Sequence, residues 1–175
     1  LNTYNRYLER FLQNELRRFE MGYEVVMDIL ERHVVTVLNV SSFDVMLRGY
    51  VDRIDRYQNR FYVIDYKSGG IVKKSAYQIG KDFTAFQLPV YAMIISEGSY
   101  NRICGMAYYR IARDIEITEI TTDAEIPSYL AQFREKVLIP TIAEMVDPTL
   151  PFVQTEDKTK CRLCDYPSFC GVKGV

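Results

Sequence analysis

The alternation of apolar and polar positions divides the chain into helical and extended segments. From Thr3 to about Glu20, apolar residues recur every three or four positions, which predicts an amphipathic helix with one buried stripe. The stripe consists of Tyr4, Tyr7, Leu8, Phe11, Leu12, Leu16 and Phe19. Residues 23–40 are rich in β-branched side chains and favour extended structure, with a short helix around Val26 and Leu30 as the alternative.

Two strands joined by a short polar link follow. Segments 45–55 and 60–67 are predicted to pair as an antiparallel hairpin around the link RYQN. If the turn is centred within the QN pair, paired residues have numbers that sum to 117, which places Asp52 opposite Asp65. A link of odd length would instead place the two acids on opposite faces of the sheet.

The second half of the chain alternates helical and extended patterns. A helix is predicted within residues 83–98, where Pro89 marks either a first turn or a kink. Residues 102–111 and 115–120 are predicted to form a second strand pair. Residues 127–146 are predicted to form a last long amphipathic helix, with one proline in its first turn and another inside it.

This order of elements indicates an α/β fold in which helices flank a central mixed β-sheet. We expect one domain over residues 1–150, followed by a cysteine-rich C-terminal segment over residues 151–175. A hydrophobic content of 48% is sufficient for a sizeable core. The chain begins at Leu1, already inside an amphipathic pattern, so we expect it to be part of a longer protein.

Charge and hydropathy limit the classes of partner. With 22 basic and 23 acidic residues, the chain must meet any polyanion through a local basic cluster rather than through its net charge. No apolar run approaches the ~20 residues that span a bilayer, and no signal peptide pattern opens the chain. We therefore expect a cytoplasmic protein without a membrane partner.

The hairpin brings together residues with a chemical use. Asp65 and Lys67 are two positions apart in one strand, so they share a face. Two carboxylates placed opposite each other repel, and a divalent cation such as Mg2+ or Mn2+ would compensate both charges. The carbonyl of Tyr66 could add a ligand, and Lys67 could position a water molecule for phosphodiester hydrolysis. A solvated or purely structural ion pair is the alternative.

These motifs together resemble the PD-(D/E)XK nuclease superfamily, in particular its RecB-like branch. The resemblance rests on LRGYVDRID, YVIDYKSGG and QLPVYA, and it extends over nearly the whole chain. It implies a restriction-endonuclease-like fold and a metal-dependent deoxyribonuclease, with exonuclease activity as the expected mode. Asp52 and Asp65 would be metal ligands and Lys67 the catalytic lysine. Gln87 and Tyr91, four residues apart on one helical face, would be accessory catalytic residues.

The C-terminal segment extends the resemblance. Cys161, Cys164 and Cys170 have the spacing Cys-x2-Cys-x5-Cys, similar to AddB-type subunits of helicase-nuclease complexes that act in DNA repair and recombination. This similarity implies a 4Fe-4S cluster in the intact protein, with DNA and a helicase subunit or helicase domain as partners. A cubane cluster needs four thiolates, so the fourth is expected before residue 1, and the cluster of this chain alone is incomplete. Zinc is the alternative metal.

The remaining candidates have simpler interpretations. His33 is interpreted as an ordinary partly buried histidine, with a metal ligand as the alternative. Cys104 lies in an apolar strand pattern and is interpreted as a buried core thiol. The basic residues around the two acidic strands could bind phosphates, or could form a solvated face. They are Arg48, Arg53, Arg56, Lys73, Lys74 and Lys81.

A second class of function remains open. The chain could be a catalytically inactive nuclease-fold domain that binds DNA or a partner subunit, with the cysteine segment as a structural staple. A nuclease that acts on RNA is a further possibility, because these motifs do not distinguish the sugar.

Overall fold

The structure is a computed structural model. It describes residues 3–26, 30–70, 72–80, 83–111, 115–151, 153–161 and 164–171. The chain divides into two compact units, residues 1–143 and residues 144–175, each held together by its own internal contacts. None of the helices in the described ranges is both long enough and apolar enough to cross a membrane.

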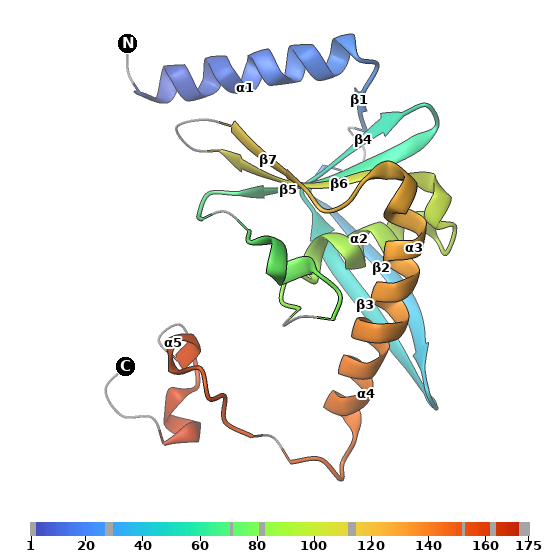
Figure 1. The fold of residues 1–175 in the computed structure, drawn as a ribbon, viewed down its shortest axis with the longest axis vertical. Helices are drawn as coiled ribbons and strands as arrows, with labels where there is room; N and C mark the ends of the chain where they lie inside the picture. Colours follow the sequence, from blue (N-terminus) through green and yellow to red (C-terminus); the bar gives the residue numbers. More distant parts are fainter. Residues whose placement is uncertain are drawn as a thin grey trace. The chain divides into compact units, whose positions relative to one another are not determined.

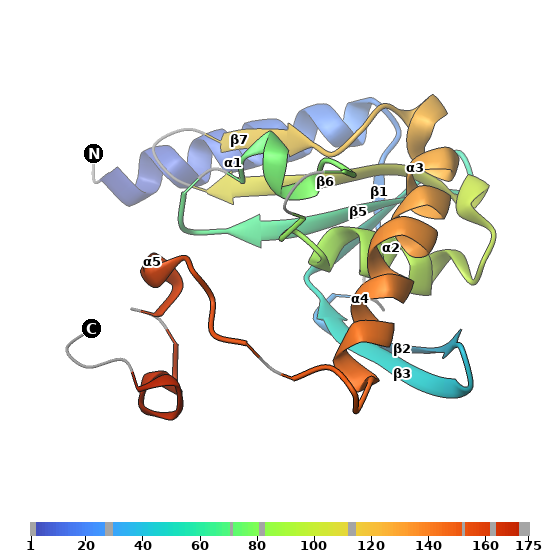
Figure 2. The ribbon, with the colours of Figure 1, turned by 60° about the horizontal axis from the view of Figure 1, so that its bottom comes forward.

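A five-stranded mixed sheet forms the centre of the first unit (Figure 1). In spatial order its strands are β1 (Glu24–Val25), β4 (Arg53–Tyr57), β5 (Arg60–Lys67), β6 (Ile103–Ile111) and β7 (Ile115–Glu119). Strands β5 and β6 run parallel, as Figure 2 shows, whereas the other neighbouring pairs are antiparallel. The predicted central mixed sheet is therefore confirmed.

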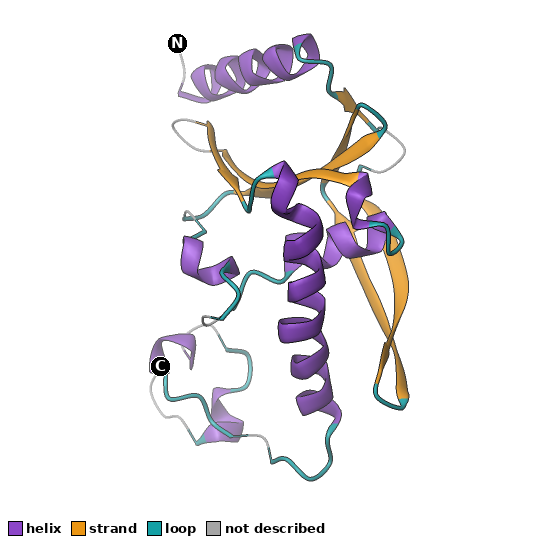
Figure 3. Cartoon of the chain, turned by 45° about the vertical axis from the view of Figure 1, so that its right-hand side comes forward, coloured by secondary structure: helices purple, strands orange, loops and turns teal. Residues whose placement is uncertain are grey.

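Helices cover both faces of this sheet. Figure 3 shows α1 (Thr3–Glu20) on one face and α2 (Gln87–Ser96) with α3 (Ile126–Phe133) on the other. The main hydrophobic core lies on the face of α2 and α3, where Leu88, Leu130 and Phe133 pack against the sheet. A smaller cluster, including Ile64 and Tyr109, belongs to the opposite face. The helices thus flank the sheet as the sequence predicted.

The prediction of one continuous strand over residues 45–55 is wrong, because the chain bends within this segment. The structure contains two strands there, β3 (Phe43–Val51) and β4, with a bend at Asp52 between them. Strand β3 pairs with β2 (Arg32–Val40) in a separate two-stranded sheet, so the described part of the ambiguous segment 23–40 is mostly extended. Residues 27–29, where the alternative short helix would fall, lie outside the described residues. At the bend, the Asp52 side chain accepts the backbone N–H of Tyr66. A side chain thereby replaces one bond of the strand ladder while the chain changes sheets.

The hairpin of β4 and β5 has the predicted register. Its pairs run from Arg53 with Ile64 to Tyr57 with Arg60, and each pair of residue numbers sums to 117. Gln58 and Asn59 form the turn with φ of 48° and 61°. Left-handed conformations at both central residues are typical of the tight turn that matches the twist of a two-residue hairpin.

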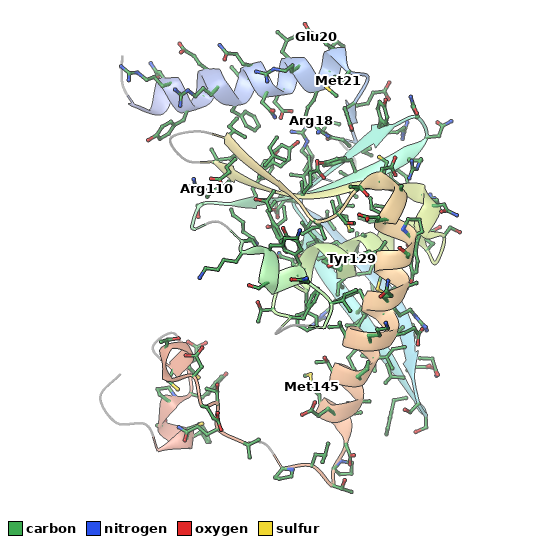
Figure 4. The ribbon with its side chains drawn as sticks, in the orientation of Figure 1. Arg18, Glu20, Met21, Arg110, Tyr129 and Met145 are labelled. Carbon is green, nitrogen blue, oxygen red and sulfur yellow. The ribbon has the colours of Figure 1, made fainter. Side chains whose placement is uncertain are left out.

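Helix α1 has the predicted length but not the predicted buried stripe. Leu8, Leu12, Leu16 and Phe19 are each more than half exposed. The buried residue is Arg18, whose guanidinium bonds Asp55 on β4 (Figure 4). Because this face of the sheet carries buried charges, the helix turns its polar edge toward the sheet and leaves its leucines at the side.

The predicted helix 127–146 is interrupted in its middle. Helix α3 passes through a π-helical turn, Arg134–Leu138, into α4 (Ile139–Val146). Pro140 has no backbone N–H for a carbonyl of the preceding turn, and wider turns of this kind absorb such a mismatch. In α2, Pro89 occupies the first turn, where a missing N–H costs little.

Candidate active site

Asp65 lies near the end of β5 and its side chain is buried, with 1% exposure. Its Oδ2 atom is 2.5 Å from the ammonium of Lys67. Apart from this ion pair, Oδ2 has no hydrogen-bond partner of good geometry among the described residues. A buried carboxylate oxygen whose described contact is an exchangeable lysine ammonium is a position that a metal cation could take.

Burial raises the pKa of the Asp65 carboxyl above its usual range, because the charged form loses water. The nearby charge of Lys67 opposes this shift, and the negative charge of Asp52 adds to it. The hydrogen bond from the Tyr66 N–H to Asp52 Oδ2, at 2.7 Å, places the Asp52 carboxylate beside the residue that follows Asp65. The ladder of β4 and β5 ends at the Arg53–Ile64 pair, so Asp52 lies at the bend just beyond it and not in a strand pair with Asp65.

Asp52 is held by the bend between the two sheets. Its Oδ2 atom accepts the Tyr66 N–H at 2.7 Å, and its carbonyl accepts the Glu31 N–H at 3.4 Å. Both contacts fix the backbone where β3 leaves its own sheet and β4 enters the central one. The carboxylate is partly exposed, in contrast to Asp65, and so remains accessible to solvent and to a substrate.

Lys67 is oriented by a chain of side chains from α2. Its ammonium donates to Gln87 Oε1 at 2.8 Å, and Gln87 Nε2 donates to the Tyr91 hydroxyl at 3.2 Å. Gln87 and Tyr91 are one helical turn apart, so both reach the same side of α2. The structure thus connects four of the five predicted catalytic residues, Asp65, Lys67, Gln87 and Tyr91, whereas Asp52 is bonded to the backbone of Tyr66.

The glycine three positions before Asp52, Gly49 on β3, is required by the packing of Tyr91. A Cβ atom at this residue would lie 2.4 Å from Tyr91 Cε1, which is closer than real Cβ contacts. Only glycine leaves space for the tyrosine ring against β3. The glycine therefore fixes the position of Tyr91 and, through Gln87, the position of Lys67.

Tyr66 contributes its backbone to the acid pair, while its side chain belongs to the opposite face of the sheet. There its hydroxyl accepts a hydrogen bond from Arg53 at 3.0 Å, and its ring lies 6.3 Å from the ring of Phe11 on α1. Side chains alternate between the two faces of β5, so that of Tyr66 lies opposite those of residues 65 and 67, which face α2. A metal contact of Tyr66 would have to use its carbonyl.

The acid pair fits a divalent cation by its chemistry. Mg2+ and Mn2+ prefer oxygen ligands and are commonly held by one or two carboxylates, with water and substrate phosphates completing the shell. The buried Asp65 oxygen and the partly exposed Asp52 offer such a set. Among the described residues, no group of three His, Cys, Asp or Glu side chains gathers to hold a metal. Among the described side chains, the two aspartates are therefore the candidate ligands of a cation, beside the Tyr66 carbonyl and non-protein ligands.

Arg110 is a neighbour of Lys67 that the sequence did not reveal. The two residues are partners in the parallel register of β5 and β6. Its guanidinium is held by Glu116 of β7, with Nη2 at 2.5 Å and Nε at 3.0 Å from one carboxylate oxygen. Parallel pairing across 43 residues leaves no local pattern in the sequence, so only the structure shows this neighbour.

The basic residues predicted to bind phosphates have different locations. Arg53 is buried and bonds Asp55 and Glu15 beneath α1, so it is a structural residue, and its predicted role at phosphates is wrong. Arg48, Arg56, Lys73 and Lys74 are exposed. Lys81 lies outside the described residues.

The two residues with alternative interpretations are also located. His33 on β2 is exposed, and its ring lies 5.2 Å from that of Tyr50, so the expectation of a partly buried histidine is not met. Gly49 is the register partner of Val34, the next residue after His33. Because neighbouring residues of a strand face opposite sides, His33 lies on the side of the hairpin away from Gly49. Cys104 is half-buried in β6, and burial raises the pKa of its thiol to about 11, which disfavours the reactive thiolate.

The second unit contains the three cysteines of the predicted cluster. Cys161 ends the short helix α5 (Lys158–Cys161) and is buried, whereas Cys164 and Cys170 are exposed. The Cys164 N–H donates to the Cys161 carbonyl, and the Tyr166 N–H donates to the Cys164 sulfur at 3.3 Å. Within the described part of this unit, the thiols do not gather into a metal-binding group. The prediction of an iron-sulfur cluster is therefore supported by the cysteine spacing alone.

Comparison with known protein families gives a direct assignment. The model of the PD-(D/E)XK nuclease superfamily matches residues 1–171. The chain therefore belongs to the PD-(D/E)XK nuclease superfamily, and its mixed sheet flanked by helices is the restriction-endonuclease-like fold. Members of this superfamily are generally metal-dependent nucleases that use divalent metals such as Mg2+, so the chain carries a nuclease-type domain for which DNA is the implied substrate.

Two further comparisons add little to this assignment. No curated protein matches the chain. Among solved structures, the crystal structure of SSO0001 is similar, with 15% sequence identity and a TM-score of 0.47, over 96% of this chain and 69% of that chain. This level of similarity carries no argument about function.

Proposed function

We propose that this chain is the nuclease domain of a DNA-processing enzyme and that it hydrolyses DNA phosphodiester bonds with Mg2+ or Mn2+. Asp52 and Asp65 hold the cation, Lys67 is the catalytic lysine, and Gln87 and Tyr91 orient it. The observation that carries this proposal is the connected group from Asp65 through Lys67 and Gln87 to Tyr91, at the edge of a partly exposed acid pair.

Each residue has a physical task in this proposal. The bound cation supplies electrophilic activation of the phosphate and a more acidic water molecule. Lys67 stabilises negative charge that develops at phosphorus or orients the attacking water, and its ammonium is kept at the reacting face by Gln87. In the absence of a cation, Lys67 neutralises Asp65, since its ammonium lies where a cation would contact Oδ2.

A cleavage assay tests this function. Linear DNA is incubated with the protein and either Mg2+, Mn2+ or EDTA, beside the variants Asp65→Ala and Lys67→Ala. We expect degradation that requires the metal, is absent in Asp65→Ala and is slower by about 10²–10³-fold in Lys67→Ala. Equal degradation by wild type and variants would refute the assignment of these residues. Metal binding without cleavage by the wild-type protein would support the inactive, DNA-binding alternative.

We further propose that the domain acts as an exonuclease within a helicase-nuclease of the AddB type, and that Cys161, Cys164 and Cys170 contribute three ligands to a 4Fe-4S cluster. The motif resemblance and the cysteine spacing support these finer statements. Iron and acid-labile sulfide, measured in the full-length protein after anaerobic purification, distinguish a cluster from zinc. Circular DNA that is cut as quickly as linear DNA would argue against an exonuclease.

A further inference from the structure

Strand β2 is paired along one of its two edges, although it is nine residues long. Its partner is β3, and no other strand in the described part of the chain lies along its second edge. Figure 1 shows the hairpin of these two strands projecting from the central sheet next to α2. The backbone N–H and C=O groups of an unpaired edge form a template on which another strand can pair.

The sequence of β2 lacks the features that commonly protect an exposed edge. Residues 33–40 contain no proline, glycine, aspartate, glutamate, lysine or arginine, and half of them are valine. The register with β3 continues from Arg32 to Val40 without a bulge. Natural proteins usually charge, bend or shorten an edge strand that stays unpaired, whereas a long, valine-rich edge favours pairing. These properties indicate that a partner covers this edge.

Two adjoining hollows follow the free edge. The first, of about 580 Å³, is lined by the four consecutive residues from His33 to Thr36, and the second, of about 180 Å³, by those from Thr36 to Asn39. Successive side chains of a strand point to opposite faces, so a hollow that touches every residue runs along the edge rather than over one face. Because both hollows include Thr36, they form one groove, called here the β2 groove. At about 3.3 Å per residue, it is about 20 Å long.

The opposite wall of the β2 groove is largely apolar. Its apolar side chains, from β5, from the end of α2 and from the turn that follows, are Phe61, Met93, Ile94, Ile95 and Tyr100. The charged residues of the wall are already paired. Arg102 lies 3.0 Å from Glu97, and Arg134 is bonded to Glu135. A nucleic acid backbone would meet arginines that have partners here, whereas an apolar polypeptide segment would meet a matching surface.

The same wall limits the size of the occupant. It stands beside the free edge of β2, so the space next to the strand is a groove and not an open surface. If β2 of a second copy paired here in antiparallel orientation, its own α2 would lie on the same face of the joined sheet, and the two walls would meet. A single extended segment avoids this conflict.

We infer that the β2 groove receives one extended segment of a partner protein, which pairs with the free edge of β2 as an additional strand. Main-chain hydrogen bonds would hold the segment, and alternate apolar side chains would contact Phe61, Ile94 and Ile95. This inference concerns binding only and does not depend on the proposed nuclease function, so it can be tested in EDTA.

The first test selects binders from a phage library of random peptides of about ten residues, the upper range of strand lengths. We expect enriched peptides in which apolar and polar residues alternate. Ile95→Asp places a charge in the apolar wall and should weaken their binding, measured by fluorescence anisotropy, by about tenfold or more. Leu12→Asp, at an exposed position of α1, is the matched control and should change the affinity less than about twofold. Failure to enrich any peptide, or equal affinities for wild type and Ile95→Asp, would overturn the inference.

The second test uses the unmodified protein and therefore decides the question if Ile95→Asp does not fold. An enriched peptide is resynthesised with one backbone N-methyl group at a time. In a paired strand every second N–H points toward β2, so we expect losses of about tenfold at alternate residues, as for a lost backbone hydrogen bond. Losses without this alternation would contradict strand pairing.

A third measurement separates a partner segment from a second copy. Sedimentation velocity of the protein alone should show a monomer. A dimer that dissociates in Ile95→Asp would assign the free edge of β2 to a second copy and would overturn the inference.

Discussion

Two aspartates are buried on opposite faces of the same sheet, and their surroundings differ. Asp55, beneath α1, accepts bonds at both oxygens, with Arg53 at 2.6 Å and 2.9 Å and Arg18 at 2.8 Å and 3.1 Å. Asp65, on the face of α2, has one cationic partner among the described residues, the ammonium of Lys67. Two rigid guanidinium groups compensate the first charge permanently, whereas one lysine on a flexible stem compensates the second.

This difference separates a structural charge from a functional one. The face beneath α1 is not fully satisfied, since Asn14 Nδ2, Glu15 Oε1 and Tyr109 OH are buried without hydrogen-bond partners in the described structure. None of these atoms belongs to a pair of carboxylates beside a lysine. The combination of an unused carboxylate oxygen, a second acid and a replaceable cation occurs at Asp65, where a metal would gain most.

The largest expected effect is on stability, at the structural aspartate. Asp55→Ala leaves two buried guanidinium groups without their shared partner, and we expect it to lower the free energy of unfolding by about 3–5 kcal/mol. Urea denaturation measures this change. Glu135→Ala removes an exposed ion-pair partner and should cost less than about 1 kcal/mol. Similar costs for the two variants would remove the contrast between the two faces.

The next effect concerns catalysis rather than stability. Lys67→Ala should lower the rate of DNA cleavage by about 10²–10³-fold, because a preorganised cation at the reacting phosphate is lost. Its affinity for Mn2+, measured by calorimetry, should be unchanged or higher, since the ammonium no longer competes for Asp65. Lys136→Ala, at an exposed lysine outside the candidate phosphate-binding residues, is the control. Loss of Mn2+ binding together with cleavage would make Lys67 a structural residue.

A smaller effect tests the link between the two sheets. Gly49→Ala forces a Cβ atom into the Tyr91 ring, and overpacking of this kind costs about 1–3 kcal/mol. In a Tyr91→Ala background the same change should cost less than about 0.5 kcal/mol, because the two effects share one contact. Gly69→Ala, where no atom lies within 4 Å of the added carbon, should be neutral. If the costs of Gly49→Ala and Tyr91→Ala in the free energy of unfolding are additive, the contact between the two residues does not cause either cost.

The smallest effect is expected at Gln87. Gln87→Ala removes the acceptor that orients Lys67, and we expect cleavage to slow by about tenfold, the cost of one charge-assisted hydrogen bond. Because the side chain is exposed, thermal stability should change by less than about 0.5 kcal/mol. A rate equal to that of the wild type would show that Lys67 needs no orientation by α2.

Much of the fold and the acid pair could be predicted from local pattern. The bounds of β5 and the register of its hairpin with β4 follow from alternation and the length of the link, and both are confirmed. The spacing of Gln87 and Tyr91 placed them on one side of a helix, and the structure shows their hydrogen bond. These features depend on contacts between residues that are close in sequence.

Features that depend on distant partners could not be predicted. The break at Asp52 arises because its side chain bonds Tyr66, and periodicity does not register such a bond. The exposure of Leu12 and Leu16 follows from the charged surface that the sheet presents to α1, and this surface exists only after β4 and β5 pair. Arg110 lies beside Lys67 in the sheet because β5 and β6 pair in parallel, and such pairing has no short-range signature in the sequence.

Titration of the metal-free protein with Mn2+ tests the central claim most directly, namely that the buried oxygen of Asp65 is a metal-binding position. Calorimetry of wild type and Asp65→Asn should show binding to the wild type and an affinity at least about tenfold weaker in the variant, since the charged ligand is lost. Unchanged circular dichroism would show that the variant is folded. An equal Mn2+ affinity in the two proteins would contradict the claim and place any metal elsewhere.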